Sequence, residues 1–76
     1  MTIEDFCELI RAELKEETVI NLSTNFKELE NYGSLSAVVI LDLVEKSFDV
    51  KINPRGFRSI NSVNDLVEVI GAEKFS

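Results

Sequence analysis

The sequence predicts an all-α fold: a small bundle of three main helices plus one short irregular helix, with a long loop between the first two main helices. Apolar residues recur at helical spacing in three separate segments. Turn-forming residues separate these segments. Strand-like alternation is confined to residues 50–52, which are too few to make a sheet without partners. At 76 residues, we expect one domain spanning 1–76.

The first helix is predicted from Thr2, which forms a capping-box pattern with Asp5. The apolar stripe that follows has helical spacing and consists of Ile3, Phe6, Ile10 and Leu14. The β-branched run at 18–20 lowers helix propensity, so we expect the helix to end near Glu16 or Glu17. Cys7 flanks the stripe and is expected to be a small buried hydrophobic residue.

Residues 18–33 are expected to form a long loop, because turn formers are frequent there. A short helical turn is predicted around Asn25–Leu29. Apolar residues scattered along the loop indicate that it lies against the core, namely Val19, Leu22, Phe26 and Leu29.

The second main helix is predicted to open at Ser34 and to stop at Asp49. One angular position of this helix carries Leu35, Val38, Leu41 and Val44. Further apolar residues widen the stripe over most of the circumference. This pattern predicts the central and most buried helix of the bundle.

The C-terminal third begins with an extended link at 50–52 and an irregular helical turn at 54–58, anchored by Phe57 and Ile60. Ser62 and Asp65 form a second capping-box pattern. A helix then runs to Ile70, and Gly71 stands where a C-terminal glycine belongs. We expect the tail at 72–76 to be frayed.

Composition excludes several classes of function. Fourteen acidic residues oppose eight basic ones, a formal charge of -6, which disfavours a helix-turn-helix-like nucleic-acid binder. This charge suits partners with basic surfaces, although by itself it is better explained as keeping a small protein soluble. No apolar run approaches the roughly 20 residues of a membrane span, and the first residues do not form a signal peptide. A single cysteine cannot form an internal disulfide and fits a reducing compartment, so we expect a cytoplasmic location. We also expect a monomer. The acidic residues are scattered, so no metal site is expected.

Ser34 lies in the stretch Gly33-Ser34-Leu35-Ser36, directly before the apolar helix. A serine nucleophile needs a base, and the chain contains no histidine. The stretch also lacks the G-x-S-x-G elbow of α/β-hydrolases. We therefore expect no enzyme activity of the chain itself. Two roles for Ser34 stay open: a helix cap, or a place of attachment.

Residues 33–70 resemble the acyl carrier and peptidyl carrier protein family. The family pattern of D-S-L, an apolar helix, F-x-V-x-I and T-V-x-D-L is matched in order and spacing by 33–35, 48–52 and 62–66. Upstream, 26–32 is similar to the segment that leads into the family's serine. The resemblance implies that Ser34 carries a 4'-phosphopantetheine arm taken from coenzyme A. A phosphopantetheinyl transferase attaches the arm, which then carries an acyl or aminoacyl thioester.

The resemblance further implies partners that load or condense acyl or aminoacyl groups in fatty-acid, polyketide or other specialised biosynthesis, with basic or apolar docking surfaces. The residues expected to meet partners are Gly33, Leu35, Val38, Val39, Asp42 and Glu45. Ordinary core packing is the alternative for the apolar members of this set, and is favoured for Val38. Gly33 replaces the family's aspartate. This departure favours a second hypothesis, a carrier-like fold without the arm that acts as a protein–protein interaction module.

Overall fold

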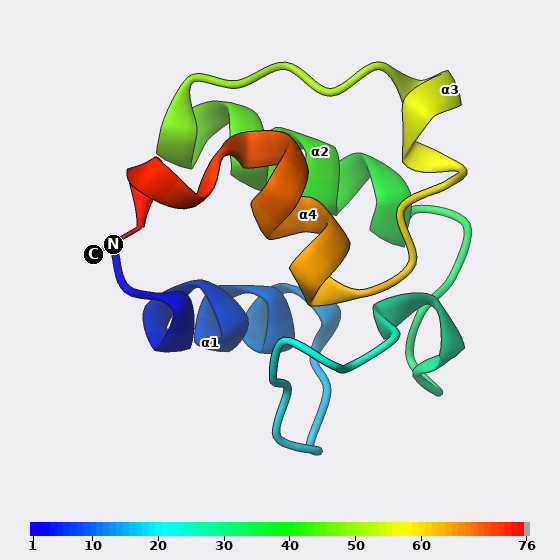
Figure 1. The fold of residues 1–76 in the computed structure, drawn as a ribbon. Helices are drawn as coiled ribbons and strands as arrows, with labels where there is room; N and C mark the ends of the chain where they lie inside the picture. The colour runs from blue at the N-terminus through cyan, green and yellow to red at the C-terminus, as the bar shows by residue number, and fades with distance from the viewer. Residues whose placement is uncertain (76) are drawn as a thin grey trace.

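The computed structural model describes residues 1–75 and is built of helices joined by irregular segments (Figure 1). Within these residues no strand forms, and only an isolated bridge joins Asn25 to Ser62. The prediction of an all-α fold with three main helices and one short helix is confirmed. The helices are α1 (Ile3–Leu14), α2 (Ser36–Phe48), α3 (Pro54–Phe57) and α4 (Val63–Ile70), with 3₁₀ turns η1 (Phe26–Glu28) and η2 (Ala72–Lys74).

The three main helices enclose the core, and the shorter elements close its sides. In Figure 1, α1 lies along the bottom, α2 lies behind, and α4 crosses in front of α2. The extended link between α2 and α3 arches over the top of the bundle. The loop after α1 descends below the bundle and returns through η1 to the start of α2. No described helix has both the length and the apolar character needed to cross a membrane.

The most buried main helix is α4, which corrects the prediction made for α2. Half of the residues of α4 are buried, namely Val63, Leu66, Val67 and Ile70. In α2 only Ile40 and Val44 are buried. The reason is that α2 is apolar on more sides than its neighbours can cover, so Val38 on the opposite side is 62% exposed. Core packing as the role of Val38 was therefore wrong.

The first helix ends at Leu14, two residues earlier than expected. Lys15 adopts a left-handed conformation (φ 55°), and its N–H donates to the carbonyl of Ala12. The N–H of Glu16 donates to the carbonyl of Arg11, whose guanidinium in turn donates to the carbonyl of Glu16 at 2.8 Å. These bonds satisfy the carbonyls of Arg11 and Ala12 in the last turn, so the end of α1 is set by a left-handed cap rather than by the β-branched residues that follow.

Cys7 is buried in α1, as predicted. Burial is the main cause that raises the pKa of its thiol, and the nearby carboxylates of Glu4 and Glu8 add to the effect. The thiol is therefore held in its neutral form and behaves as a core residue.

The long loop packs onto the bundle through Phe26, which is fully buried at the predicted turn η1. The N–H groups of Val63 and Asn64 donate to carbonyls of Thr24 and Leu22, which ties the loop to the start of α4. Val19 does not contribute to the core, because 76% of it is exposed. That part of the loop prediction was wrong.

The chain after α4 is ordered by aromatic packing. The ring centroid of Phe75 lies 5.4 Å from that of Phe6 and 4.9 Å from that of Phe48. The preceding residues form η2. The frayed tail expected at 72–76 is therefore wrong for 72–75, while Ser76 lies outside the described residues.

Candidate functional site

Ser34 sits at the corner of a tight turn formed by residues 33–36. The N–H of Ser36 donates to the carbonyl of Gly33 at 3.0 Å. Leu35 has φ −88° and ψ −11°, close to the values of the third residue of a type I turn. Helix α2 begins at Ser36. Ser34 therefore stands two residues before the helix, and the prediction that it opens the helix was wrong.

A second hydrogen bond closes the same turn. The N–H of Gly33 donates to Oγ of Ser36 at 2.8 Å. In this bond the side chain of the fourth residue of the turn accepts the backbone N–H of the first residue. Helix periodicity and the family resemblance indicated no role for Ser36. The signal was a serine placed three residues after Gly33.

The hydroxyl of Ser34 is free for other partners. Ser34 is exposed, and its side chain makes no hydrogen bond to any of residues 1–75. The residue before α2 is Leu35, which provides no side-chain cap. The structure therefore does not support the alternative in which Ser34 acts only as a helix cap.

The surroundings of Ser34 are open. A side chain at Gly33 would meet no atom within 4 Å, and Gly33 does not use a positive φ. The first turn of α2 contains no acidic residue. The start of a helix carries partial positive charge and backbone N–H groups without helical partners. The corner at Ser34 can therefore accommodate an added anionic group.

The predicted recognition residues divide between exposed and half-buried positions. Val39 is half-buried. Gly33 is exposed in the turn before α2, and the other four residues share one exposed side of the helix and its approach. We call this set the α2 solvent face: Leu35, Val38, Asp42 and Glu45.

The charge of this face is weaker than the sequence implies. Nζ of Lys46 lies 3.0 Å from Oδ2 of Asp42, one helical turn away. The Lys46 ammonium donates a hydrogen bond to the Asp42 carboxylate, and this bond raises the pKa of the Lys46 amine. Glu45 forms no ion pair with another described residue. Glu45 is therefore the less compensated carboxylate of the face.

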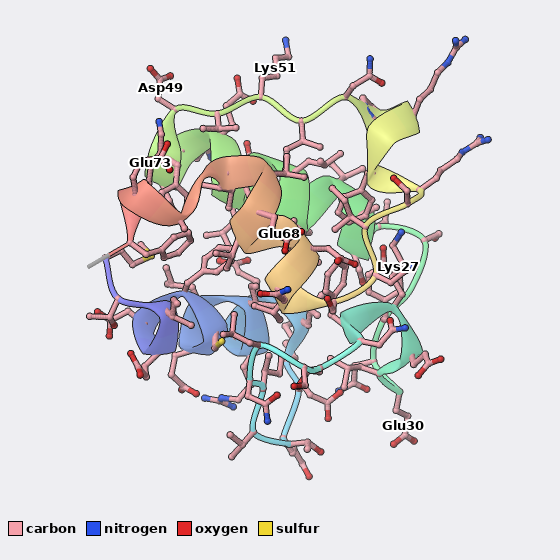
Figure 2. All side chains as sticks on the ribbon, viewed as in Figure 1. Lys27, Glu30, Asp49, Lys51, Glu68 and Glu73 are labelled. Carbon is pink, nitrogen blue, oxygen red and sulfur yellow. The ribbon has the colours of Figure 1, made fainter. Side chains whose placement is uncertain are left out.

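A shallow groove runs beside the α2 solvent face. It lies between α2 and the extended link and has a volume of about 350 Å³. Asp42 and Glu45 supply its carboxylates, and Lys51 also borders it. Figure 2 shows Lys51 pointing away from the link into solvent. The apolar lining consists of Val38, Leu41, Ile52 and Pro54. We call this feature the α2–link groove; the sequence pattern did not indicate that residues of the link would line it.

Lys27, labelled in Figure 2, connects η1 to α3. Its Nζ donates to the carbonyl of Phe57 at 2.6 Å and lies 4.5 Å from the centroid of the Phe57 ring. Burial lowers the pKa of the Lys27 amine. Because cations favour the C-terminal end of a helix, this contact fixes α3 beside η1.

The family assignment follows from a comparison with protein-family models. A model described as "phosphopantetheine attachment site" matches residues 4–70, which include nearly all of the chain from α1 to α4. This chain belongs to that family. Comparisons with curated proteins and with solved structures gave no match. The resemblance to acyl and peptidyl carrier proteins is confirmed.

Phosphopantetheine-attachment domains carry 4'-phosphopantetheine as a covalent group. The corner at Ser34 fits such a group, because its hydroxyl is exposed and the space at Gly33 is open. Within residues 1–75, no group of three or more histidine, cysteine or acidic side chains is placed to hold a metal ion. A carrier domain of this family interacts with a phosphopantetheinyl transferase and with biosynthetic enzymes.

Proposed function

We propose that Ser34 is the attachment point of the 4'-phosphopantetheine arm, and that the chain is a non-catalytic, cytoplasmic carrier protein. It would shuttle an acyl or aminoacyl group between enzymes of fatty-acid, polyketide or other specialised biosynthesis. One observation carries the proposal: in a chain of the phosphopantetheine-attachment family, Ser34 presents an exposed hydroxyl without a hydrogen-bond partner among residues 1–75.

The attachment step uses coenzyme A as co-reactant. Oγ of Ser34 forms a bond to the phosphorus that bears the pantetheine arm, and the phosphorus–oxygen bond of the pyrophosphate breaks. Adenosine 3',5'-bisphosphate leaves, and the serine proton passes to a base on the transferase. The carrier needs no histidine for this step, because the base and the metal belong to the transferase.

The attached arm supplies a terminal thiol that holds the cargo as a thioester. A tether raises the effective concentration of the cargo at each enzyme on which the carrier docks. The apolar side of the α2–link groove supports partial shelter of an acyl group. The α2 solvent face supports docking through Leu35 and Val38, with Glu45 available for a basic partner side chain.

The test is labelling with coenzyme A and a phosphopantetheinyl transferase of broad specificity, followed by intact-mass measurement. Wild type is expected to gain one phosphopantetheine group. Ser34→Ala should stay folded by circular dichroism and gain none. Ser47→Ala is the matched control, because Ser47 is an exposed serine on α2 that should not affect labelling. Labelling of the Ser34→Ala variant would disprove the assignment.

A second candidate function is supported by Gly33 and by the exposed apolar residues of α2. Without a carboxylate before Ser34, and with Leu35 75% and Val38 62% exposed, the fold suits an arm-free protein–protein interaction module. Absence of labelling by several transferases, together with a stable complex that Val38→Asp abolishes, would favour this function over the carrier.

A further inference from the structure

We propose that Ser36 is the positioning residue of the attachment site: its side chain locks the 33–36 turn and so presents the Ser34 hydroxyl to the transferase. This inference rests on the proposed function and assigns a role to a residue two positions away from the reacting hydroxyl.

The two ends of the turn are joined twice. Ser36 donates its N–H to the carbonyl of Gly33 at 3.0 Å and accepts the N–H of Gly33 on Oγ at 2.8 Å. Only the second bond depends on a side chain. Ser34 and Leu35 lie between the two joined residues, so their backbone conformation is held from both sides.

The bond to Oγ of Ser36 matters because the other side chains of this turn do not restrain it. Gly33 has wide backbone freedom and no side chain of its own to cap the turn. Leu35 is 75% exposed and contributes no cap. The side chain of Ser34 makes no bond to the described residues. Oγ of Ser36 is therefore the side-chain atom that ties the corner to the first turn of α2.

Loss of the lock should reduce the fraction of molecules with the presented conformation. When the competent conformer is only partly populated, apparent affinity falls by that fraction. A net hydrogen bond of ordinary strength corresponds to a change of about two- to tenfold in the equilibrium constant between the presented conformation and its alternatives, and the populated fraction changes by up to this factor. The expected effect is therefore on KM for the carrier substrate, while kcat at saturation is retained.

The experiment compares wild type, Ser36→Ala, Ser36→Thr and Ser47→Ala as substrates of one transferase with coenzyme A. Ser36→Ala should raise KM measurably, by up to about tenfold, with kcat unchanged, and Ser36→Thr, which keeps a hydroxyl, should restore KM. Ser47→Ala should match wild type, since it removes a hydroxyl from the same helix without touching the turn.

Hydrogen exchange at the Gly33 amide provides an independent readout in the unmodified protein. Exchange at this amide should be faster in Ser36→Ala and return to the wild-type rate in Ser36→Thr. Equal KM values for wild type and Ser36→Ala would overturn the positioning role while leaving the carrier function intact. Failure of wild type itself to be labelled would overturn the carrier function, and the positioning role with it.

Discussion

Two serines separated by one residue differ in what their hydroxyls do. Oγ of Ser36 accepts the N–H of Gly33, whereas the Ser34 side chain makes no bond to a described residue. The sequence allowed Ser34 to be a cap or an attachment point, because serine is favoured for both. Only the turn geometry separates these roles, since it places Ser34 at the corner and Ser36 at its base. The sequence therefore allowed Ser34 to be named as a candidate attachment residue, but it did not show that Ser36 stabilises the turn around it.

Gly33→Asp tests whether the missing carboxylate limits modification. The variant should fold normally, because a side chain at position 33 meets no atom within 4 Å. Its free energy of unfolding should change by less than about 1 kcal/mol. Labelling should be faster than in wild type, and Gly33→Asn should give no comparable gain. Gly56→Asp, also at an open glycine, is the control for added charge elsewhere. An unchanged labelling rate in Gly33→Asp would contradict this prediction.

Asp65 should make stability depend on pH in the acid range. Its carboxylate accepts the N–H groups of Asn61 and Ser62, which lowers the pKa of Asp65 in the folded state. A lowered folded pKa gives stabilisation that is present above the ordinary value of about 4 and is lost as pH falls through the folded value. Melting temperatures measured from pH 7 to pH 2.5 should fall less steeply in Asp65→Asn than in wild type. Parallel pH profiles for the two proteins would exclude this role.

At the scale of elements, helix periodicity predicted where α1, α2 and α4 lie, and the capping-box pattern at Ser62 correctly placed the start of α4. It could not predict which side of α2 is buried, because apolar residues cover most of that helix. Ile40 and Val44 are buried in a core cluster that also contains residues of α1 and α4, whereas Val38 lies outside it. The sequence likewise did not show the early end of α1, since Lys15 takes a left-handed conformation without being glycine or asparagine.

Two alanine substitutions on α2 test which side of the helix is buried. Ile40→Ala removes a fully buried side chain and should lower the free energy of unfolding by about 2–5 kcal/mol. Val38→Ala removes an exposed one and should change it by no more than about 0.5 kcal/mol. Urea denaturation of both variants provides the measurement. Equal losses from the two substitutions would show that Val38 is part of the core.

At the scale of the whole molecule, the two ends of the chain are packed together by three aromatic rings. Phe6 comes from α1, Phe48 ends α2, and Phe75 follows η2. Nζ of Lys74 also donates to the carbonyl of Phe48 at 3.4 Å. The sequence did not predict this cluster. The segment after α4 is too short to show a periodic pattern, and Phe6 and Phe48, the partners of Phe75, are distant along the chain.

Phe75→Ala should therefore weaken the entire fold rather than loosen a tail. We expect a loss of about 1–3 kcal/mol in the free energy of unfolding, because a half-buried ring loses both its burial and two aromatic contacts. The matched control is Val69→Ala, which trims an apolar side chain that is 50% exposed. Thermal unfolding followed by circular dichroism decides the matter, and a melting temperature equal to that of wild type would mean that the ring is dispensable.

The aromatic cluster also lies at the end of the bundle opposite to Ser34. It fastens the start of α1 and the segment after α4 to the C-terminal end of α2, while the corner with Ser34 precedes the other end of that helix (Figure 1). Thirteen residues of helix separate these two poles by roughly 18 Å. A fluorescent label or a further domain joined before α1 or after Phe75 would thus lie at the end of the bundle remote from Ser34, and partner enzymes could still reach the Ser34 end.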